Sequence, residues 1–339
     1  MISRVFHRWE RRLASIDNNR VVRPFDWGVE WIEGLDAGSG AADDVAAQLS
    51  SWADATVVNS DAFFAVSPAS DYVLERGKLT FSSAVVTPHP KNNLVRARFF
   101  PSDSPKGRRR AVLVLPQWNA DAGGHVGLCR LLNRFGITAL RLSLPYHHDR
   151  MPPELRRADY IVSANVGRTM QVCRQAVLDA RQSIAWLAQQ GYESIGILGT
   201  SLGSCLSMLT AAHEPLVRAA ALNHISPFFA DVIWEGLSTA HVREGLNDAI
   251  DLERLRRLWM PISPFPYLDR VRGKAVLLVY ARYDLTFPVT LSKMLVEEFR
   301  RRELPHEVAV LPCGHYSTGV SPFKWLDGFV LCRFLNRNL

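Results

Sequence analysis

Short runs of apolar, mostly β-branched residues alternate with longer helical patterns along the chain from about residue 79 onwards. In the longer stretches apolar residues recur every three or four positions, which is typical of helices that pack one face on a sheet. The short runs predict eight strands, at 79–86, 94–100, 111–115, 138–144, 195–198, 219–223, 275–280 and 307–311. This alternation predicts an α/β fold with helices on both faces of a mostly parallel sheet.

The segments between the expected strands indicate how the strands pair. Residues 89–93, His-Pro-Lys-Asn-Asn, are too few for a crossover helix, so the first two strands should be antiparallel. Longer helical segments separate most of the later strands, and they require parallel pairing through right-handed crossovers. The clearest of these helices is predicted over residues 163–190.

Two regions fall outside the strand and helix alternation. Residues 1–78 are expected to form a helical extension packed on a main domain of residues 79–339, with helical pieces near 4–14 and 44–55. Residues 227–272, after the sixth strand, are too long for one crossover and are expected to form a cap over one end of the sheet. The cap is rich in aromatic residues, which predicts a cap core with some side chains facing a pocket.

The first helical piece of the extension is basic and amphipathic. Val5, Phe6, Trp9 and Leu13 line one side, and arginines occupy other positions. Such a helix can lie on a membrane surface, which indicates peripheral membrane contact as one role. The alternative is that the helix docks on its own domain and leaves the arginines in water.

Composition narrows the class of protein. The chain has 339 residues, 47% of them apolar and 22% charged, which excludes a disordered or collagen-like protein. Its net charge of +7 is spread along the chain, so no nucleic-acid partner is expected. The five cysteines are an odd number without CxxC spacing, which favours a reducing compartment over a disulfide framework or a zinc site. Without the apolar run of a secretory signal or a membrane span, the expected location is cytoplasmic.

The segment Gly199-Thr200-Ser201-Leu202-Gly203 carries the clearest candidate chemistry. It joins an apolar strand directly to a helical pattern, so Ser201 should occupy a strained corner whose close backbone passage needs the two glycines. The corner exposes the hydroxyl, and the start of the next helix offers a backbone N–H and a positive dipole end to an oxyanion. The pattern predicts a nucleophilic serine, with an ordinary helix N-cap as the alternative.

A serine hydroxyl becomes a good nucleophile when a histidine accepts its proton and a carboxylate orients that histidine. Asp284 follows the apolar strand 275–280, and His315 follows the next strand, 307–311. Carboxyl ends of parallel strands are the usual location of sites in such sheets. We therefore predict that Ser201, Asp284 and His315 form a triad. The alternative for Asp284 is to cap the helix that begins near Pro288.

These residues resemble those of the α/β-hydrolase superfamily of serine esterases and lipases over about residues 79–339. The resemblance implies an eight-stranded α/β-hydrolase fold with a helical cap after strand 6, Ser201 as nucleophile, Asp284 as orienting acid and His315 as general base. The turn at Pro145-Tyr146 and the ending Gly314-His-Tyr-Ser are similar to those of a poorly characterised group of α/β-hydrolase-domain proteins that share the N-terminal extension.

One segment departs from the superfamily pattern. Many members carry a His-Gly pair after the third strand, where this chain reads Leu115-Pro-Gln-Trp-Asn119. Matching by position implies an oxyanion hole formed by the backbone N–H groups of Leu202 and Trp118. Pro116 has no N–H to donate, so Gln117 is the other candidate for the second donor.

The sequence thus predicts a serine hydrolase that cleaves a carboxylic ester or thioester through an acyl-enzyme, acting on a small-molecule or lipid-like ester. No cofactor or metal is expected, because adjacent histidines such as His147 and His148 point apart and lack a second ligand cluster. The alternatives are an acyltransferase or a peptidase with the same triad, and a binding module that keeps the fold without catalysis.

Overall fold

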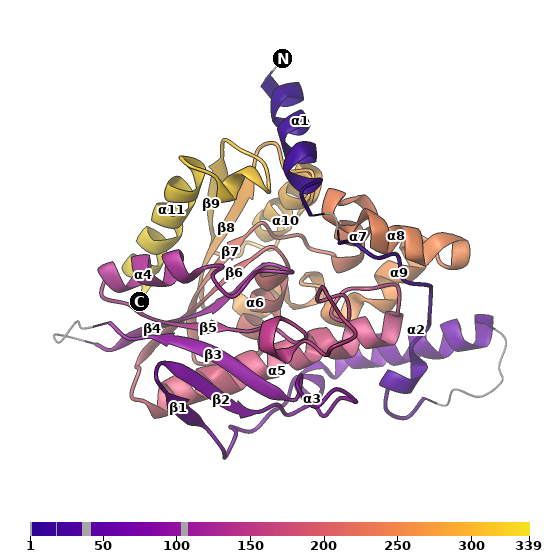
Figure 1. Cartoon of the computed structure of the whole chain (residues 1–339), viewed down its shortest axis with the longest axis horizontal. Helices are drawn as coiled ribbons and strands as arrows, with labels where there is room; N and C mark the ends of the chain where they lie inside the picture. Colours follow the sequence, from indigo (N-terminus) through magenta and orange to yellow (C-terminus); the bar gives the residue numbers. More distant parts are fainter. Residues whose placement is uncertain (1, 18, 36–41, 103–107) are drawn as a thin grey trace.

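The computed structural model describes residues 2–17, 19–35, 42–102 and 108–339 (Figure 1). Its centre is a nine-stranded sheet in the order β1-β2-β3-β5-β4-β6-β7-β8-β9. The strands are β1 (Val73–Glu75), β2 (Lys78–Ser82), β3 (Leu94–Phe100), β4 (Arg110–Leu115), β5 (Thr138–Leu142), β6 (Ser194–Thr200), β7 (Val217–Asn223), β8 (Ala275–Ala281) and β9 (Glu307–Leu311).

The sheet has nine strands where the sequence predicted eight. The additional strand, β1, has three residues, all of them exposed, so no run of buried apolar positions marks it. It pairs antiparallel with β2 across a two-residue turn in which Arg76 and Gly77 have φ of 48° and 74°. Positive φ at both turn residues suits the twist of a tight hairpin. The expected helical extension of residues 1–78 therefore also contributes an edge strand.

The predicted pairing is confirmed. β2 and β3 are antiparallel, as expected from their short connection, and β3 also pairs antiparallel with β5. The contacts of β4 with β5 and β6, and those from β6 through β9, are all parallel. The carboxyl ends of β4, β6, β7, β8 and β9 consequently lie along one edge of the sheet, where ligand sites form in this class of sheet.

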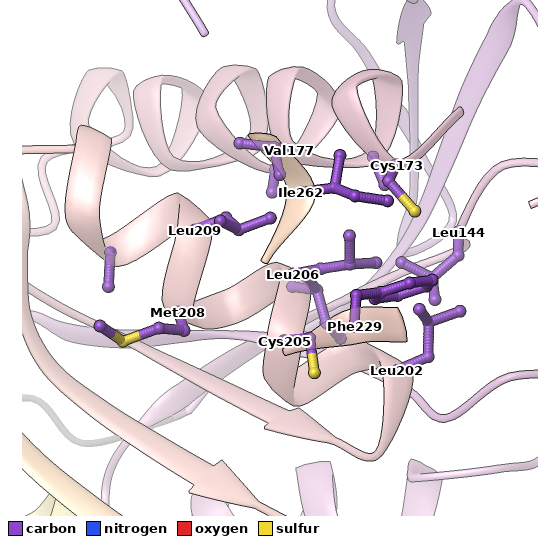
Figure 2. Close-up of a cluster of buried hydrophobic side chains, with 14 of the residues drawn as sticks. Leu144, Cys173, Val177, Leu202, Cys205, Leu206, Met208, Leu209, Phe229 and Ile262 are labelled. Atoms are coloured by element: carbon purple, nitrogen blue, oxygen red, sulfur yellow. The ribbon is translucent and has the colours of Figure 1, made fainter. Parts of the chain in front are cut away.

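Helices cover both faces of the sheet, as predicted. Alternate residues of β4 point into two separate cores, with Leu113 and Leu115 in one and Val112 and Val114 in the other. Helices α5 (Val166–Gln189), α6 (Leu202–His213) and α10 (Val289–Arg301) pack into the first core, which Figure 2 shows around α6. Helices α4 (Val126–Arg134) and α11 (Phe323–Asn338) pack into the second. Central strands such as β4, β5 and β6 are therefore buried on both sides, which explains their continuous apolar runs.

The predicted helix over 163–190 is observed as α5. It begins after Asn165, whose side chain accepts a hydrogen bond from the backbone N–H of Arg168. This N-cap fixes the start of the helix three residues later than expected. Among the described residues, no helix combines the length and the apolar character that crossing a bilayer would require.

The segment between β7 and β8 forms a helical layer of α7 (Phe229–Glu235), α8 (Ala240–Leu246), α9 (Leu252–Leu258) and short 3₁₀ segments. Phe229, Trp259 and Tyr267 are buried in it. The N-terminal segment adds α1 (Ile2–Ala14), α2 (Ala42–Val58) and α3 (Ser60–Phe63), and α2 packs against α9. The aromatic side chains thus form a core that joins this layer to the rest of the molecule.

Helix α1 docks on the molecule from Phe6 onwards, and its first turn is exposed. Figure 1 shows it projecting from the body of the structure, with the N-terminus at its outer end. Glu10 and Ala14 are buried, whereas Ile2 and Val5 are exposed. Val5, expected on the apolar side with Phe6 and Trp9, therefore faces water. The most buried side chain is instead a glutamate on an arginine-rich helix.

Candidate active site

Ser201 occupies the corner between β6 and α6 in a strained backbone conformation, with φ 58° and ψ −123°. This region is nearly restricted to glycine, and a serine there is maintained by its surroundings. The backbone N–H of Ser201 donates to the carbonyl of Asn223 at the end of β7, at 2.8 Å. The hydroxyl makes no capping hydrogen bond to α6. The N-cap alternative is therefore wrong, and the hydroxyl remains available for chemistry.

Gly199 and Gly203 allow the close backbone contacts that the corner needs. A Cβ on Gly199 would lie 2.1 Å from the carbonyl oxygen of Gly203, and a Cβ on Gly203 would lie 2.2 Å from that of Leu115. Neither contact tolerates a side chain. The first turn of α6 consequently lies directly against the end of β4, next to the segment that carries Trp118.

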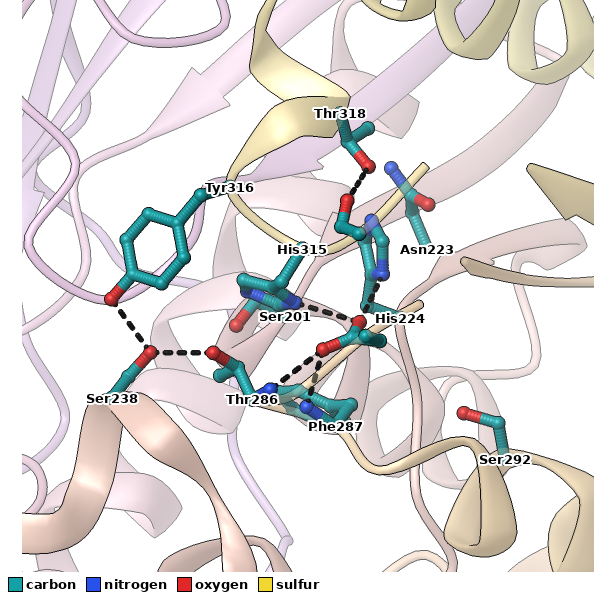
Figure 3. A network of polar contacts seen from close by, with 12 residues as sticks. Ser201, Asn223, His224, Ser238, Thr286, Phe287, Ser292, His315, Tyr316 and Thr318 are labelled. Carbon is teal, nitrogen blue, oxygen red and sulfur yellow. Dashed lines mark hydrogen bonds and ion pairs between the residues drawn. The ribbon is translucent and has the colours of Figure 1, made fainter. Parts of the chain in front are cut away.

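Asp284 and His315 are brought together from the ends of β8 and β9. The Nδ1 atom of His315 donates to Oδ2 of Asp284 at 3.0 Å (Figure 3). The other oxygen, Oδ1, accepts the backbone N–H groups of Thr286 and Phe287 at 2.8 and 2.7 Å. Asp284 thus holds the turn ahead of α10 and orients the imidazole, but it does not cap that helix as the alternative predicted, because the N-cap is Pro288 and no side chain caps it. One carboxylate serves both purposes.

The electrostatics suit a charged acid and a basic histidine. Burial of Asp284 opposes its ionisation, but the neighbouring His315 charge and the histidine hydrogen bonds outweigh this effect and hold its pKa well below 3.8. Burial likewise opposes protonation of His315, yet the Asp284 carboxylate raises the pKa of the imidazole above 6.5. Asp284 is therefore anionic at neutral pH, and His315 readily accepts a proton.

Ser201 and His315 line the same cavity. In Figure 3 the Ser201 side chain overlaps the imidazole of His315, whose Nδ1 atom is hydrogen-bonded to Asp284. Within the described part of the chain, no side chain accepts or donates a hydrogen bond at Ser201 Oγ. Hydrogen bonds between nucleophile and base are often long or open without substrate.

The segment after β4 is held next to Ser201 by a buried histidine. His147 accepts the backbone N–H of Asn119 through Nε2 at 2.9 Å, and its Nδ1–H donates to the carbonyl of Pro145. Burial lowers the pKa of His147 to about 3, so the ring stays neutral and able to accept. The Trp118 indole donates to the carbonyl of Ala158 at 2.9 Å. The backbone that carries both candidate oxyanion donors is therefore fixed.

Gln117, Trp118 and Leu202 all line the cavity with Ser201. Among the described residues, no acceptor takes the backbone N–H of Gln117 or that of Trp118. Leu202 is the first residue of α6, where a backbone N–H has no partner within the helix. The assignment of Leu202 and Trp118 as oxyanion donors stays a prediction, as does the alternative of Gln117.

A second histidine, His224, contacts the same carboxylate and was missed by the sequence analysis. Its Nδ1 donates to Asp284 Oδ2 at 2.8 Å, and its ring centroid lies 4.6 Å from that of His315 (Figure 3). It directly follows β7, so its position at a strand end was the signal that could have identified it. Next to it, Asn223 donates to Asp327, a carboxyl whose pKa burial raises to about 6.

The ligand atoms of His224, Asp284 and His315 all lie within 4.8 Å of one another, which is compact enough to hold a metal ion. In this structure, however, both Nδ1 atoms direct their protons at Asp284. In this arrangement both histidines are hydrogen-bonded to the Asp284 carboxylate. A metal would have to displace both protons.

The cavity has a volume of about 1070 Å³, slightly above the usual range of small-molecule sites. Much of its lining is apolar, and the contributing side chains come from α4, the following loops and the cap: Leu128, Leu131, Met151, Val162, Phe229, Val232 and Ile233. Polar side chains such as Arg156 and Lys324 also line it. The cavity can therefore accommodate a bulky apolar group next to Ser201.

No family model and no curated protein matches this sequence. Solved structures are similar at low identity. The acylaminoacyl peptidase of Pyrococcus horikoshii aligns with TM-score 0.60 and 13% identity, over 83% of this chain and 44% of the peptidase. An acetyl xylan esterase from Paenibacillus sp. R4 aligns with TM-score 0.60 and 14% identity, over 97% and 99% of the two chains. Acetyl xylan esterase 1 from Thermoanaerobacterium sp. JW/SL YS485 gives 0.58 and 14%, over 85% and 93%.

This chain thus spans less than half of the peptidase but nearly all of the two esterases. With the strand order and the cap after β7, these similarities show that the protein has an α/β-hydrolase fold. The predicted fold class is confirmed, apart from the additional edge strand. Because one fold hosts many activities, the function has to be argued from the site.

Proposed function

We propose that this protein is a serine hydrolase that cleaves a carboxylic ester or thioester through an acyl-enzyme intermediate. The observation that carries the proposal is the meeting of two arrangements at one cavity: Ser201 in its strained corner, and the His315 imidazole held by Asp284. Each arrangement is costly to build, and acyl transfer needs both.

The geometry supports the following sequence of steps. His315 accepts the proton of Ser201 through Nε2 while Oγ attacks the carbonyl carbon of the substrate, and Asp284 stabilises the imidazolium. Backbone N–H groups at the start of α6 and after β4 hold the oxyanion. The protonated His315 gives its proton to the leaving group, and a water molecule then releases the acyl group by the same route.

The cavity lining supports an ester with a sizeable apolar part. Leu128 and Leu131 from α4 and Phe229, Val232 and Ile233 from the cap offer apolar walls on the cavity that contains Ser201. Burying one methylene contributes about 0.8 kcal/mol, so even four additional carbons in an acyl chain would strengthen binding measurably. We therefore expect medium or long acyl chains to be preferred to acetyl.

The test combines covalent labelling with an ester series. Wild-type protein and Ser201→Ala are incubated with a fluorophosphonate probe, and hydrolysis of p-nitrophenyl esters from acetyl to palmitoyl is measured for both. We expect labelling and hydrolysis in the wild type alone. Equal labelling of the two proteins, or hydrolysis that persists in Ser201→Ala, would reject Ser201 as the nucleophile.

The same assay separates the alternatives that share the triad. An N-acyl amino acid p-nitroanilide tests for a peptidase, the class that one similar structure represents. Added alcohol or amine, with product analysis, tests for acyl transfer to an acceptor other than water. Esters hydrolysed at least tenfold faster than the anilide, with free acid as the product, would support the proposal.

A further inference from the structure

The buried Glu10 of α1 contacts the loop that carries His315. Its carboxylate oxygens accept the backbone N–H groups of Tyr316 at 2.8 Å and Ser317 at 2.9 Å. Glu10 is fully buried, and it is the sole acidic residue of α1, whose other charged residues are arginines. A buried carboxylate is costly unless its hydrogen bonds are satisfied, so this contact is a specific one.

The His315 loop leaves room for the Glu10 carboxylate because position 314 is a glycine. A Cβ on Gly314 would lie 2.3 Å from Cδ of Glu10, so a side chain at position 314 would displace the glutamate. The chain after α1 adds a further contact, because Arg20 donates to the Tyr316 hydroxyl at 3.0 Å. The residues on both sides of His315 are thus in contact with the N-terminal segment.

Helix α1 also lies against the loop of the catalytic acid. The Phe6 ring stacks on Tyr283, directly before Asp284, with ring centroids 4.4 Å apart and an interplanar angle of 12°. Tyr283 in turn donates its backbone N–H to the carbonyl of Cys313, at 2.9 Å. One helix therefore contacts both loops whose side chains must meet, about 300 residues away along the chain.

We propose that Glu10 is a positioning residue, which holds the His315 loop so that the imidazole faces both Asp284 and Ser201. The inference rests on the proposed function, because it gives α1 a role in that same site. The hydrogen bonds from Tyr316 and Ser317 fix the backbone immediately after His315. A misplacement of a catalytic group by about 1 Å is sufficient to cost about 10² in rate.

The first experiment replaces Glu10 by Gln in the full-length protein. The amide keeps the shape of the side chain but offers an N–H₂ group where the loop presents a backbone N–H, so one hydrogen bond is lost. We expect kcat for a p-nitrophenyl ester to fall about 10²-fold with little change in KM. Arg8→Gln, an exposed substitution two residues away on the same helix, serves as the matched control and should retain wild-type kcat.

Amide hydrogen exchange distinguishes positioning from a general loss of stability. In Glu10→Gln, residues 314–318 should exchange faster, while residues 199–205 at the Ser201 corner should keep their wild-type rates.

The pH profile gives a second readout. The titratable groups around the His315 imidazole are Asp284, His224 and Glu10. Removing the Glu10 charge should also move the acid limb of the kcat/KM profile to lower pH, because that negative charge favours the imidazolium.

A second pair of variants keeps the inference testable if Glu10→Gln folds poorly. Gly314→Ala pushes the carboxylate away without altering α1, and Glu10→Ala removes the group that the new methyl would meet. We expect the two losses of kcat to be non-additive in the double variant, since both break the same contact. Additive losses would overturn the inference, and so would wild-type kcat in Glu10→Gln. Absence of Ser201-dependent activity in the wild type would instead reject the proposed function.

Discussion

The two halves of the candidate site are built in different ways. The corner at Ser201 is shaped by Gly199 and Gly203, within two residues of it, and by backbone contacts with β4 and β7. The loop at His315 is held by Asp284, 31 residues earlier, and by Glu10, about 300 residues earlier. The corner of the proposed nucleophile is thus mainly a local structure, whereas the position of the proposed base depends on tertiary contacts. Changes near Ser201 should abolish chemistry or folding, and changes around His315 should weaken the chemistry by degrees.

The largest effect is expected for Ser201→Ala, which removes the reacting atom. We expect kcat for ester hydrolysis to fall by about 10⁴- to 10⁶-fold with the fold retained, as for comparable triads. Steady-state kinetics together with circular dichroism would measure both. Near wild-type turnover would show that the corner is strained for another reason.

Asp284→Asn should be the next most severe change. The amide keeps the size of the side chain but favours the wrong tautomer of His315, so kcat should fall by about 10⁴-fold. The contacts of Oδ1 with Thr286 and Phe287 are retained if the amide oxygen faces them. A loss of less than tenfold in kinetic assays would contradict the role of Asp284 as the orienting acid.

Gly203→Ala tests how far the corner depends on close backbone contact. The added methyl would meet the carbonyl oxygen of Leu115 at 2.2 Å, and backbone cannot move aside as a flexible side chain can. We expect the free energy of unfolding to fall by about 1–3 kcal/mol, measured by urea denaturation. Gly273→Ala, where nothing lies within 4 Å of the new methyl, is the matched control and should be close to neutral.

The smallest effects should come from pH and from His224. The base form of His315 is neutral and its pKa lies above 6.5, so kcat/KM should rise as pH increases through that pKa. Asp284 has a depressed pKa, so it adds no further limb above pH 4, and the stability that it contributes is lost only as pH falls below 3.8.

His224→Leu removes the second hydrogen bond to Asp284 Oδ2 and leaves a side chain of similar size. We expect kcat/KM to fall about tenfold, which corresponds to about 1.5 kcal/mol, the lower end of the range for a hydrogen bond to a charged group. The carboxylate would then attract the His315 proton more strongly, so the acid limb should move to higher pH. An unchanged pH profile would show that His224 does not affect the electrostatics of the pair.

The sequence alone predicted the α/β class, the parallel part of the sheet and the candidates Ser201, Asp284 and His315. Strands buried on both faces appear as continuous apolar runs, and polar residues directly after such runs lie at one edge of a parallel sheet. These features follow from nearest neighbours in the chain. They can be identified without knowing which distant segments meet.

Only the tertiary structure revealed β1 and the contact of Glu10 with the His315 loop. The exposed strand β1 buries no apolar face, and its existence depends on pairing with β2. Glu10 follows Phe6 by four residues and precedes Leu13 by three, on a face expected to be apolar. Its partners are backbone N–H groups, and a backbone group leaves no pattern in the sequence. The contacts of Glu10 with the His315 loop therefore emerged only in the folded chain, which brings these distant segments together.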